Sequence, residues 1–191
     1  MVALHDKLYA IGGRVDKDLS LDSVEMYRPE VDQWEEVAPL SSPRRSVAVA
    51  AMGGRIYAMG GSANKRISGR VERYNPLSNQ WEIRRSLLKP RFFSVLAPVN
   101  NRLYLIGGAT MDEAGNVVCS PSVDVYIPAT DTWSVVMPML DPRPRRGRPW
   151  WAPRFTWWVA TAGIRPLACR LSSALIQTST RGAWSPVSIN P

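Results

Sequence analysis

Apolar residues occupy nearly every position of three short segments, each of which runs into a pair of glycines. The middle segment is residues 55–61, Arg-Ile-Tyr-Ala-Met-Gly-Gly, and its counterparts are residues 8–13 and 102–108. A five-residue strand that is apolar throughout, and not only at alternate positions, has both faces buried. The pattern therefore predicts small sheets that are stacked between other sheets.

Each glycine pair begins a longer pattern that occurs three times. The first glycines of the pairs, Gly12, Gly60 and Gly107, are 48 and 47 residues apart. Each pair is followed by valine, an acid, any residue and tyrosine, then by a proline and a tryptophan. The tryptophan follows the tyrosine by seven positions in every copy, as 27/34, 74/81 and 126/133. A fixed period near 50 residues indicates a repeat architecture.

Each repeat is predicted to contain four short strands. In the middle repeat the first strand covers residues 46–52, and the turn Gly53-Gly54 leads into the second strand. The third strand carries the tyrosine and the fourth carries the tryptophan, and both rings are expected to pack between sheets while their polar atoms find partners. The chain starts at what matches a second strand, so the first repeat is expected to lack its first strand.

These residues resemble the kelch repeat, whose units are the four-stranded blades of a β-propeller. The resemblance covers about residues 2–142, with repeats at residues 2–37, 44–84 and 91–136. It is strongest to the kelch-like, or BTB–kelch, group. The fold implied is all-β: a partial kelch β-propeller of about three four-stranded blades, the first incomplete. A fourth repeat does not follow, which indicates a fragment or a truncated isoform of a larger propeller.

The resemblance implies a protein-interaction module and not an enzyme. In the kelch-like group, the propeller recognises a protein substrate and presents it to a cullin-RING ubiquitin ligase. Other kelch proteins engage actin or other cytoskeletal partners, and this role is the alternative. Recruitment of a cullin would require a BTB domain in a longer form of the chain.

Partner contacts in the kelch-like group come from the residues after the glycine pair and from the start of each first strand. Arginine there offers a planar fork for carboxylates, which favours an acidic peptide motif as the ligand. The alternative is that these are solvated loop charges. Transferred by position, the candidate residues are Arg14, Ser62, Asn64, Lys65, Arg66, Arg45, Ser46, Arg91 and Phe92.

The residues that carry chemistry do not form a catalytic or metal-binding set. Some kelch-type propellers are copper oxidases, but that chemistry needs several convergent ligands. The chain has one histidine, His5, which falls in a predicted turn. One histidine without a positioned acid does not make a catalytic triad. We therefore expect no catalytic residue, no cofactor and no metal ion.

The net charge of +8 is confined to the C-terminal part of the chain. All sixteen acids lie in residues 1–142, whereas residues 143–191 contain eight arginines, no lysine, no acid and five of the eight tryptophans. This tail has no strand or helix period and is expected to be a disordered segment outside the kelch repeats, from an alternative or out-of-frame C-terminus. Its arginines and tryptophans leave nucleic-acid or membrane binding as less favoured alternatives.

The N-terminus has no basic segment followed by an apolar one, so a secretory signal peptide is not expected. No stretch reaches the roughly 18 apolar residues of a membrane span. The expected location is the cytoplasm.

Overall fold

The computed structural model describes residues 1–16 and 19–140. The chain divides into two units, Met1–Arg143 and Pro144–Pro191, and every described residue belongs to the first unit. The prediction of a disordered tail at residues 143–191 lies outside the described residues.

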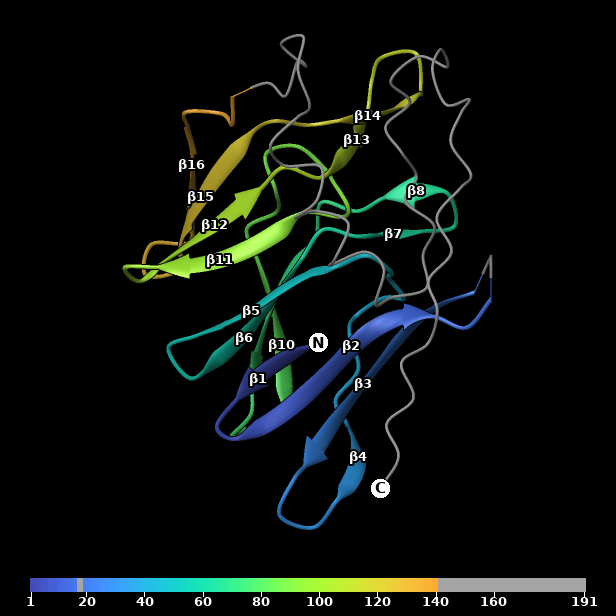
Figure 1. The fold of residues 1–191 in the computed structure, drawn as a ribbon, viewed down its shortest axis with the longest axis vertical. Coiled ribbons are helices and arrows are strands. Elements are labelled where there is room, and N and C mark those ends of the chain that lie inside the picture. The colour runs from blue at the N-terminus through green and yellow to red at the C-terminus, as the bar shows by residue number, and fades with distance from the viewer. Residues whose placement is uncertain (17–18, 141–191) are drawn as a thin grey trace, which may run out of the picture. The chain divides into compact units, whose positions relative to one another are not determined.

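The described residues form three four-stranded antiparallel sheets and two two-stranded sheets, without a helix (Figure 1). We call the larger sheets blade 1, blade 2 and blade 3. Blade 1 contains β1 (Val2–Leu4), β2 (Lys7–Arg14), β3 (Ser20–Arg28) and β4 (Gln33–Val37). Blade 2 contains β5 (Ala48–Met52), β6 (Arg55–Met59), β9 (Val71–Asn75) and β10 (Gln80–Arg84). Blade 3 contains β11 (Val95–Val99), β12 (Arg102–Ile106), β15 (Val123–Ile127) and β16 (Thr132–Val136).

Each blade is a meander in which neighbouring strands are consecutive in the repeat. The two-stranded sheets are hairpins inserted between the second and third strands of blades 2 and 3. They are β7 (Ser62–Ala63) with β8 (Arg66–Ile67), and β13 (Ala109–Met111) with β14 (Val117–Cys119). The predicted all-β fold of four-stranded blades is confirmed.

The prediction that the first repeat lacks its first strand was wrong. The three-residue strand β1 pairs with β2 through the turn His5-Asp6. His5 and Asp6 have φ angles of 49° and 57°, the left-handed conformation that Asn100 and Asn101 also adopt in the matching turn of blade 3. Histidine and aspartate are not a typical pair for such a turn, so the hairpin signal was weak.

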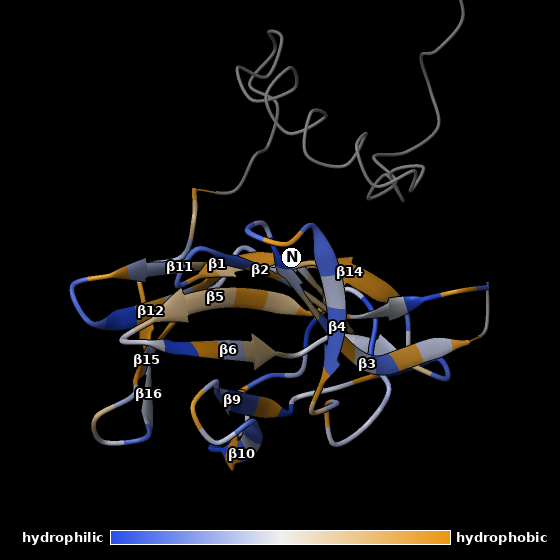
Figure 2. Ribbon diagram, turned by 90° about the horizontal axis from the view of Figure 1, so that it is seen from below, coloured by the Kyte–Doolittle hydropathy of each residue, from blue (hydrophilic) through white to orange (hydrophobic). Residues whose placement is uncertain are grey.

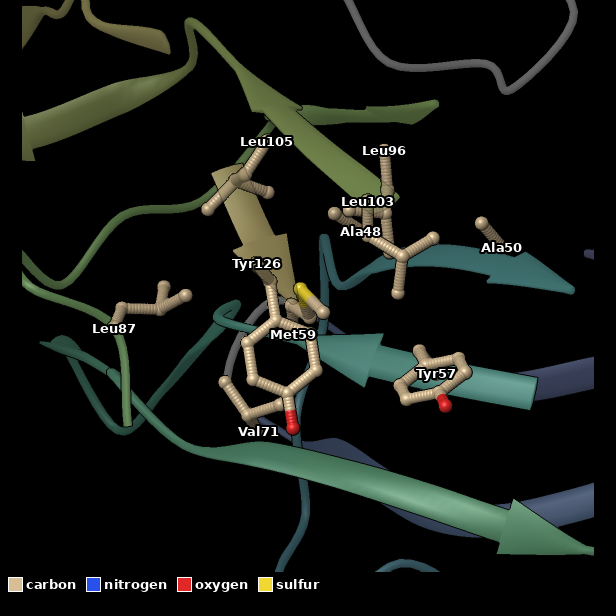
Figure 3. Close-up of a cluster of buried hydrophobic side chains, with 10 residues drawn as sticks. All are labelled: Ala48, Ala50, Tyr57, Met59, Val71, Leu87, Leu96, Leu103, Leu105 and Tyr126. Atoms are coloured by element: carbon tan, nitrogen blue, oxygen red, sulfur yellow. The ribbon is translucent and has the colours of Figure 1, made fainter. Parts of the chain in front are cut away.

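Strand β6 is buried on both faces, as its continuous apolar sequence predicts. Ile56 packs with Tyr9 and Met26 of blade 1, whereas Tyr57 and Met59 pack into the cluster between blades 2 and 3. Figure 3 shows this second cluster, in which the rings of Tyr57 and Tyr126 meet edge to face with centroids 6.2 Å apart. The core of the described residues therefore lies between the blades.

Strand β4 is the polar edge of blade 1. In β4 the residues from Gln33 to Glu36 are exposed, and Figure 2 shows this strand mainly in the hydrophilic colour. No helix in the described part of the chain is long and apolar enough to cross a membrane.

Polar atoms at the blade edges join each blade to the preceding one. Trp81 Nε1 donates a 2.8 Å hydrogen bond to the carbonyl of Ala38 in the linker that leaves blade 1. Asn79 Oδ1 accepts from the amide of Ala38 at 2.9 Å and from the hydroxyl of Tyr74 at 2.8 Å. Burial raises the pKa of Tyr74 to about 12.

The same arrangement recurs one blade later. Trp133 Nε1 donates to the carbonyl of Arg85 at 2.9 Å. Asp131 Oδ1 accepts from the amide of Arg85 at 3.0 Å and from the hydroxyl of Tyr126 at 2.6 Å. The repeated tyrosine and tryptophan are therefore core residues whose polar atoms hold consecutive blades together.

Candidate protein-interaction surface

The residues after each glycine pair lie at one edge of the blades. Figure 1 shows the end of β2, the β7–β8 hairpin and the β13–β14 hairpin on one side, and the turn between β11 and β12 on the opposite side. Gly61 brings the linker between blades 1 and 2 to this edge, because a Cβ there would lie 2.8 Å from the carbonyl oxygen of Arg45. Arg45 and Ser62 then exchange two backbone hydrogen bonds of 2.9 Å. The linker and the hairpin therefore form one continuous surface.

We call this surface the loop face. Asn64, Lys65 and Arg66 are exposed in the turn of the β7–β8 hairpin, where Asn64 and Lys65 have φ angles of 48° and 61°. Arg14 is exposed at the end of β2. Arg45 and Ser46 are half-buried in the linker between blades 1 and 2. The predicted residues on this face are Arg14, Arg45, Ser46, Asn64, Lys65, Arg66 and the half-buried Phe92.

Phe92 holds the corresponding place in the next linker. Its backbone pairs with that of Ala109 through hydrogen bonds of 3.0 and 2.8 Å, as Arg45 pairs with Ser62. Ser62 is a residue of the scaffold, because only 8% of its surface is exposed. The seven residues of the loop face thus come from two loops and two linkers that the sheets position together.

A hollow of about 220 Å³ opens beside the β7–β8 hairpin. It brings Asn64 and Arg66 of the hairpin next to Arg44 of the linker. The complete lining is Ser42, Pro43, Arg44, Ala63, Asn64, Arg66, Ile67 and Ser68. A side chain of a bound peptide that entered this hollow would meet amide and guanidinium donors.

Arg91 does not lie on the loop face. Its side chain is only 2% exposed and donates to Asp124 Oδ2 at 2.5 Å inside blade 3. It also donates to the carbonyl of Ser122. The expectation that Arg91 contacts a partner is therefore replaced by a structural role, because its guanidinium is enclosed by its own blade.

Arg44 is the equivalent of Arg91 in blade 2. It forms a buried ion pair with Glu72 and donates to the carbonyls of Gly60 and Arg70 at 3.0 and 3.1 Å. Burial lowers the pKa of Arg44 and that of Arg91, against the opposing effect of the paired carboxylates. Burial likewise raises the pKa of Asp124, which Arg91 opposes.

No single motif of the sequence predicts these ion pairs, because the arginine and the acid belong to different segments of the repeat. Arginine follows proline in both linkers, at Arg44 and Arg91, and an acid follows valine in both third strands, at Glu72 and Asp124. The two patterns recur together, which is the signal of a conserved geometry within the repeat. Arg45, by contrast, is equivalent to Phe92 and not to Arg91.

The described residues contain no group of three or more histidine, cysteine, aspartate and glutamate side chains that could hold a metal ion. His5 is exposed in the turn between β1 and β2.

Three successive matches to the kelch motif cover residues 1–41, 43–88 and 90–140, which together are more than half of the chain. The chain belongs to the kelch-repeat family. The resemblance seen in the repeated glycine, tyrosine and tryptophan residues is thereby confirmed.

Several kelch-like proteins are among the relatives of this kelch chain. It is 46% identical over 61 residues to Kelch-like protein 33 of Homo sapiens and 41% identical over 58 residues to Kelch-like ECH-associated protein 1A of Danio rerio. It is also 43% identical over 61 residues to Beta-scruin of Limulus polyphemus. The matched segments cover 32%, 29% and 32% of the chain, and 11%, 10% and 7% of those relatives.

Proposed function

We propose that this kelch chain is a non-enzymatic protein-interaction module whose loop face binds an acidic segment of a partner protein. The observation that carries the proposal is the exposed cationic turn of the β7–β8 hairpin beside the 220 Å³ hollow. Membership of the kelch-repeat family supports a protein-interaction propeller.

The charge of the loop face favours an acidic ligand. Within the described residues, none of the ion pairs involves Arg14, Lys65 or Arg66. Their charges are therefore open to a partner, whereas the charges of Arg44 and Arg91 are neutralised inside the blades. Several cations on one rim attract carboxylates and speed association with an acidic partner.

The backbone of the loop face supports a firm binding site. The linker and the hairpin are held by paired backbone hydrogen bonds, and Arg44, which lines the hollow, is fixed by its buried ion pair with Glu72. Recognition residues on loops that a rigid sheet positions lose little conformational freedom on binding.

Fluorescence anisotropy of a labelled short polyglutamate peptide, titrated with the full chain, tests the proposal. We expect binding that weakens with added salt, because exposed charges are screened. The paired change Lys65→Glu and Arg66→Glu should weaken binding about tenfold or more. Arg102→Glu is the matched control, because Arg102 is exposed at the opposite end of blade 3. Equal binding of polylysine, or equal losses in both variants, would contradict the proposal.

Within this class, we propose a role like that of the substrate-recognition propeller of a cullin-RING ubiquitin ligase adaptor. Kelch-like proteins are among the relatives, which supports this role, and a cytoskeletal scaffold is the alternative. Co-sedimentation of the full chain with actin filaments distinguishes the two, since loop-face variants that abolish co-sedimentation would favour the scaffold.

A further inference from the structure

The part of the loop face that belongs to blade 3 is apolar where the corresponding part of blade 2 is polar. Phe92 occupies the place of Arg45, because the two residues make the same backbone pairing with the residue after a glycine pair. Phe93 follows in the place of Ser46, and both residues have a φ angle of 55°. The repeat therefore holds two aromatic residues at blade 3 in positions where blade 2 holds a guanidinium and a hydroxyl group.

Phe93 is exposed in a backbone conformation that large side chains rarely adopt. It is 44% exposed, and its ring centroid lies 4.9 Å from that of the half-buried Phe92. A left-handed φ is uncommon for a bulky residue and costs free energy. The amide of Phe93 donates to the carbonyl of Ser46 at 3.2 Å, which helps to fix this conformation. An exposed ring at a strained position is a feature that clusters at binding sites.

The β13–β14 hairpin continues this apolar surface. Met111 and Val117 lie directly opposite each other in the hairpin and are 41% and 60% exposed. Side chains alternate between the two faces of a strand, so both lie on the same face as Phe92, which pairs with the first residue of β13. Thr110, on the other face, is 5% exposed and donates to the backbone of the linker. We call Phe92, Phe93, Met111 and Val117 the apolar patch.

The apolar patch adjoins the cationic turn of the β7–β8 hairpin. Ser46, whose carbonyl binds the amide of Phe93, follows Arg45 in the linker, and Arg45 pairs with Ser62 at the start of the β7–β8 hairpin. The two hairpins lie on the same side of the blades (Figure 1). A peptide segment that is bound at the cationic turn therefore has the apolar patch beside it.

The turn of the β13–β14 hairpin separates the charged part of such a segment from its uncharged part. Asp112 and Glu113 are exposed in this turn. The carboxylate of Asp112 accepts from the amide of Asn116 at 2.8 Å, which holds it in the turn. Carboxylates of a ligand are repelled by these acids and attracted by the cations of blade 2. Uncharged side chains of the ligand are therefore favoured at the apolar patch.

We propose that the acidic segment bound by the loop face also carries an aromatic side chain, which packs on the apolar patch. The inference rests on the proposed function, because the carboxylates of the same segment bind the cationic turn. Aromatic rings pack favourably against other rings and against methionine sulfur. The contact also removes the exposed side chains of Phe93, Met111 and Val117 from water. The ligand is then a peptide in which an aromatic residue flanks a run of acids.

Two peptides of equal charge test this inference. Both contain a short run of glutamates, which is flanked at both ends by glycine and tryptophan in one peptide and by glycine and serine in the other. Flanking both ends makes the comparison independent of the direction of the bound peptide. Fluorescence anisotropy with the full chain should show about tenfold tighter binding of the tryptophan peptide. This ratio should persist as added salt weakens the binding of both peptides, because salt screens only the charges.

Phe93→Ser removes the ring without a new demand on the backbone, since Ser46 adopts the same φ in blade 2. We expect this variant to bind the tryptophan peptide about tenfold more weakly, and to bind the serine peptide as the unaltered chain does. Leu77→Ser is the matched control, because Leu77 is 88% exposed in the turn between β9 and β10, at the opposite end of blade 2. Far-ultraviolet circular dichroism checks that both variants remain folded.

The outcomes distinguish this inference from the proposed function. Equal binding of the two peptides, with a loss of both in the Lys65→Glu and Arg66→Glu variant, would support the acidic ligand and overturn the aromatic contact. A preference for tryptophan that Phe93→Ser does not reduce, or that Leu77→Ser reduces equally, would also overturn the contact. Binding of neither peptide would overturn both proposals.

Discussion

Arg44 of a linker and Glu72 of strand β9 form an ion pair that is almost completely buried, with side chains 1% and 0% exposed. The arginine lies between blades 1 and 2 in the sequence, and the glutamate belongs to blade 2. Arg91 and Asp124 repeat the relationship one blade later. A linker of the kelch chain therefore contributes part of the interior of the blade that follows it.

Glu72→Gln tests the contribution of this ion pair to stability. The amide can still accept from the backbone of Ser41, but the charge of Arg44 is left buried without a counter-charge. We expect the free energy of unfolding in urea to fall by about 3–5 kcal/mol. Glu35→Gln is the control, because Glu35 pairs with Arg28 at 3.0 Å on the surface and should contribute less than about 1 kcal/mol. Similar losses in both variants would show that the buried pair has no special role.

Asn79 is expected to hold blade 2 against blade 1. Asn79→Ala removes the acceptor of the Ala38 amide and of the Tyr74 hydroxyl, and it places alanine at a φ of 50°. We expect a loss of about 2–4 kcal/mol in thermal or urea unfolding. Asn79→Asp should be close to neutral, since aspartate occupies the same place at Asp32 and Asp131. A large loss in both variants would contradict this role.

Gly60 is required where the linker passes close to the end of β6. A Cβ at Gly60 would lie 2.3 Å from the carbonyl oxygen of Arg91, and its φ is +67°. Left-handed backbone strain alone costs about 1–2 kcal/mol. Gly60→Ala should lower the free energy of unfolding by more than this, because the added Cβ also collides with the carbonyl oxygen. Gly115→Ala is the control: Gly115 has a similar φ of +82°, and a Cβ there would meet no atom within 4 Å. Its loss of stability therefore measures the backbone strain without the collision. Equal midpoints of unfolding for the two variants would show that crowding at Gly60 is unimportant.

Two buried tyrosines predict a loss of stability in alkaline solution. Burial raises the pKa of Tyr74 and of Tyr126 to about 12 from an ordinary value of 10.0. The folded state then keeps protons that the unfolded state releases. The contribution of these tyrosines to the free energy of unfolding is therefore fully present below pH 10.0 and is lost as the pH rises toward 12. Urea unfolding at increasing pH measures this loss, and Tyr74→Phe should reduce its slope. If Tyr74→Phe leaves the slope unchanged, the loss of stability does not arise from ionisation of Tyr74.

Much of the fold could be predicted because each residue of a repeat has two equivalents in the other repeats with which it can be compared. The apolar sequence of β6 predicted two covered faces, and the positions of Tyr74 and Trp81 predicted rings between sheets with bonded polar atoms. Strand β1 could not be predicted in this way, since His5-Asp6 is not one of the dipeptides that are typical of a two-residue hairpin turn.

The loop face was only partly predictable. In the linker 43–46, Arg44 and Arg45 are adjacent, and irregular backbone has no period to show which side chain points inward. Alignment of the two linkers on their prolines pairs Arg44 with Arg91 and Arg45 with Phe92, so Arg45 and Arg91 do not occupy equivalent positions. The structure then shows that the first position of each pair, Arg44 and Arg91, is the buried one.

Each linker arginine precedes its paired acid in the sequence, and this order has a consequence for the synthesis of the protein. Arg44 precedes Glu72 by 28 residues, and Arg91 precedes Asp124 by 33. A ribosome makes the chain from its N-terminus, so each guanidinium is exposed before its carboxylate exists. A nascent blade can therefore neutralise its buried acid as soon as its third strand leaves the exit tunnel, without waiting for any later part of the chain.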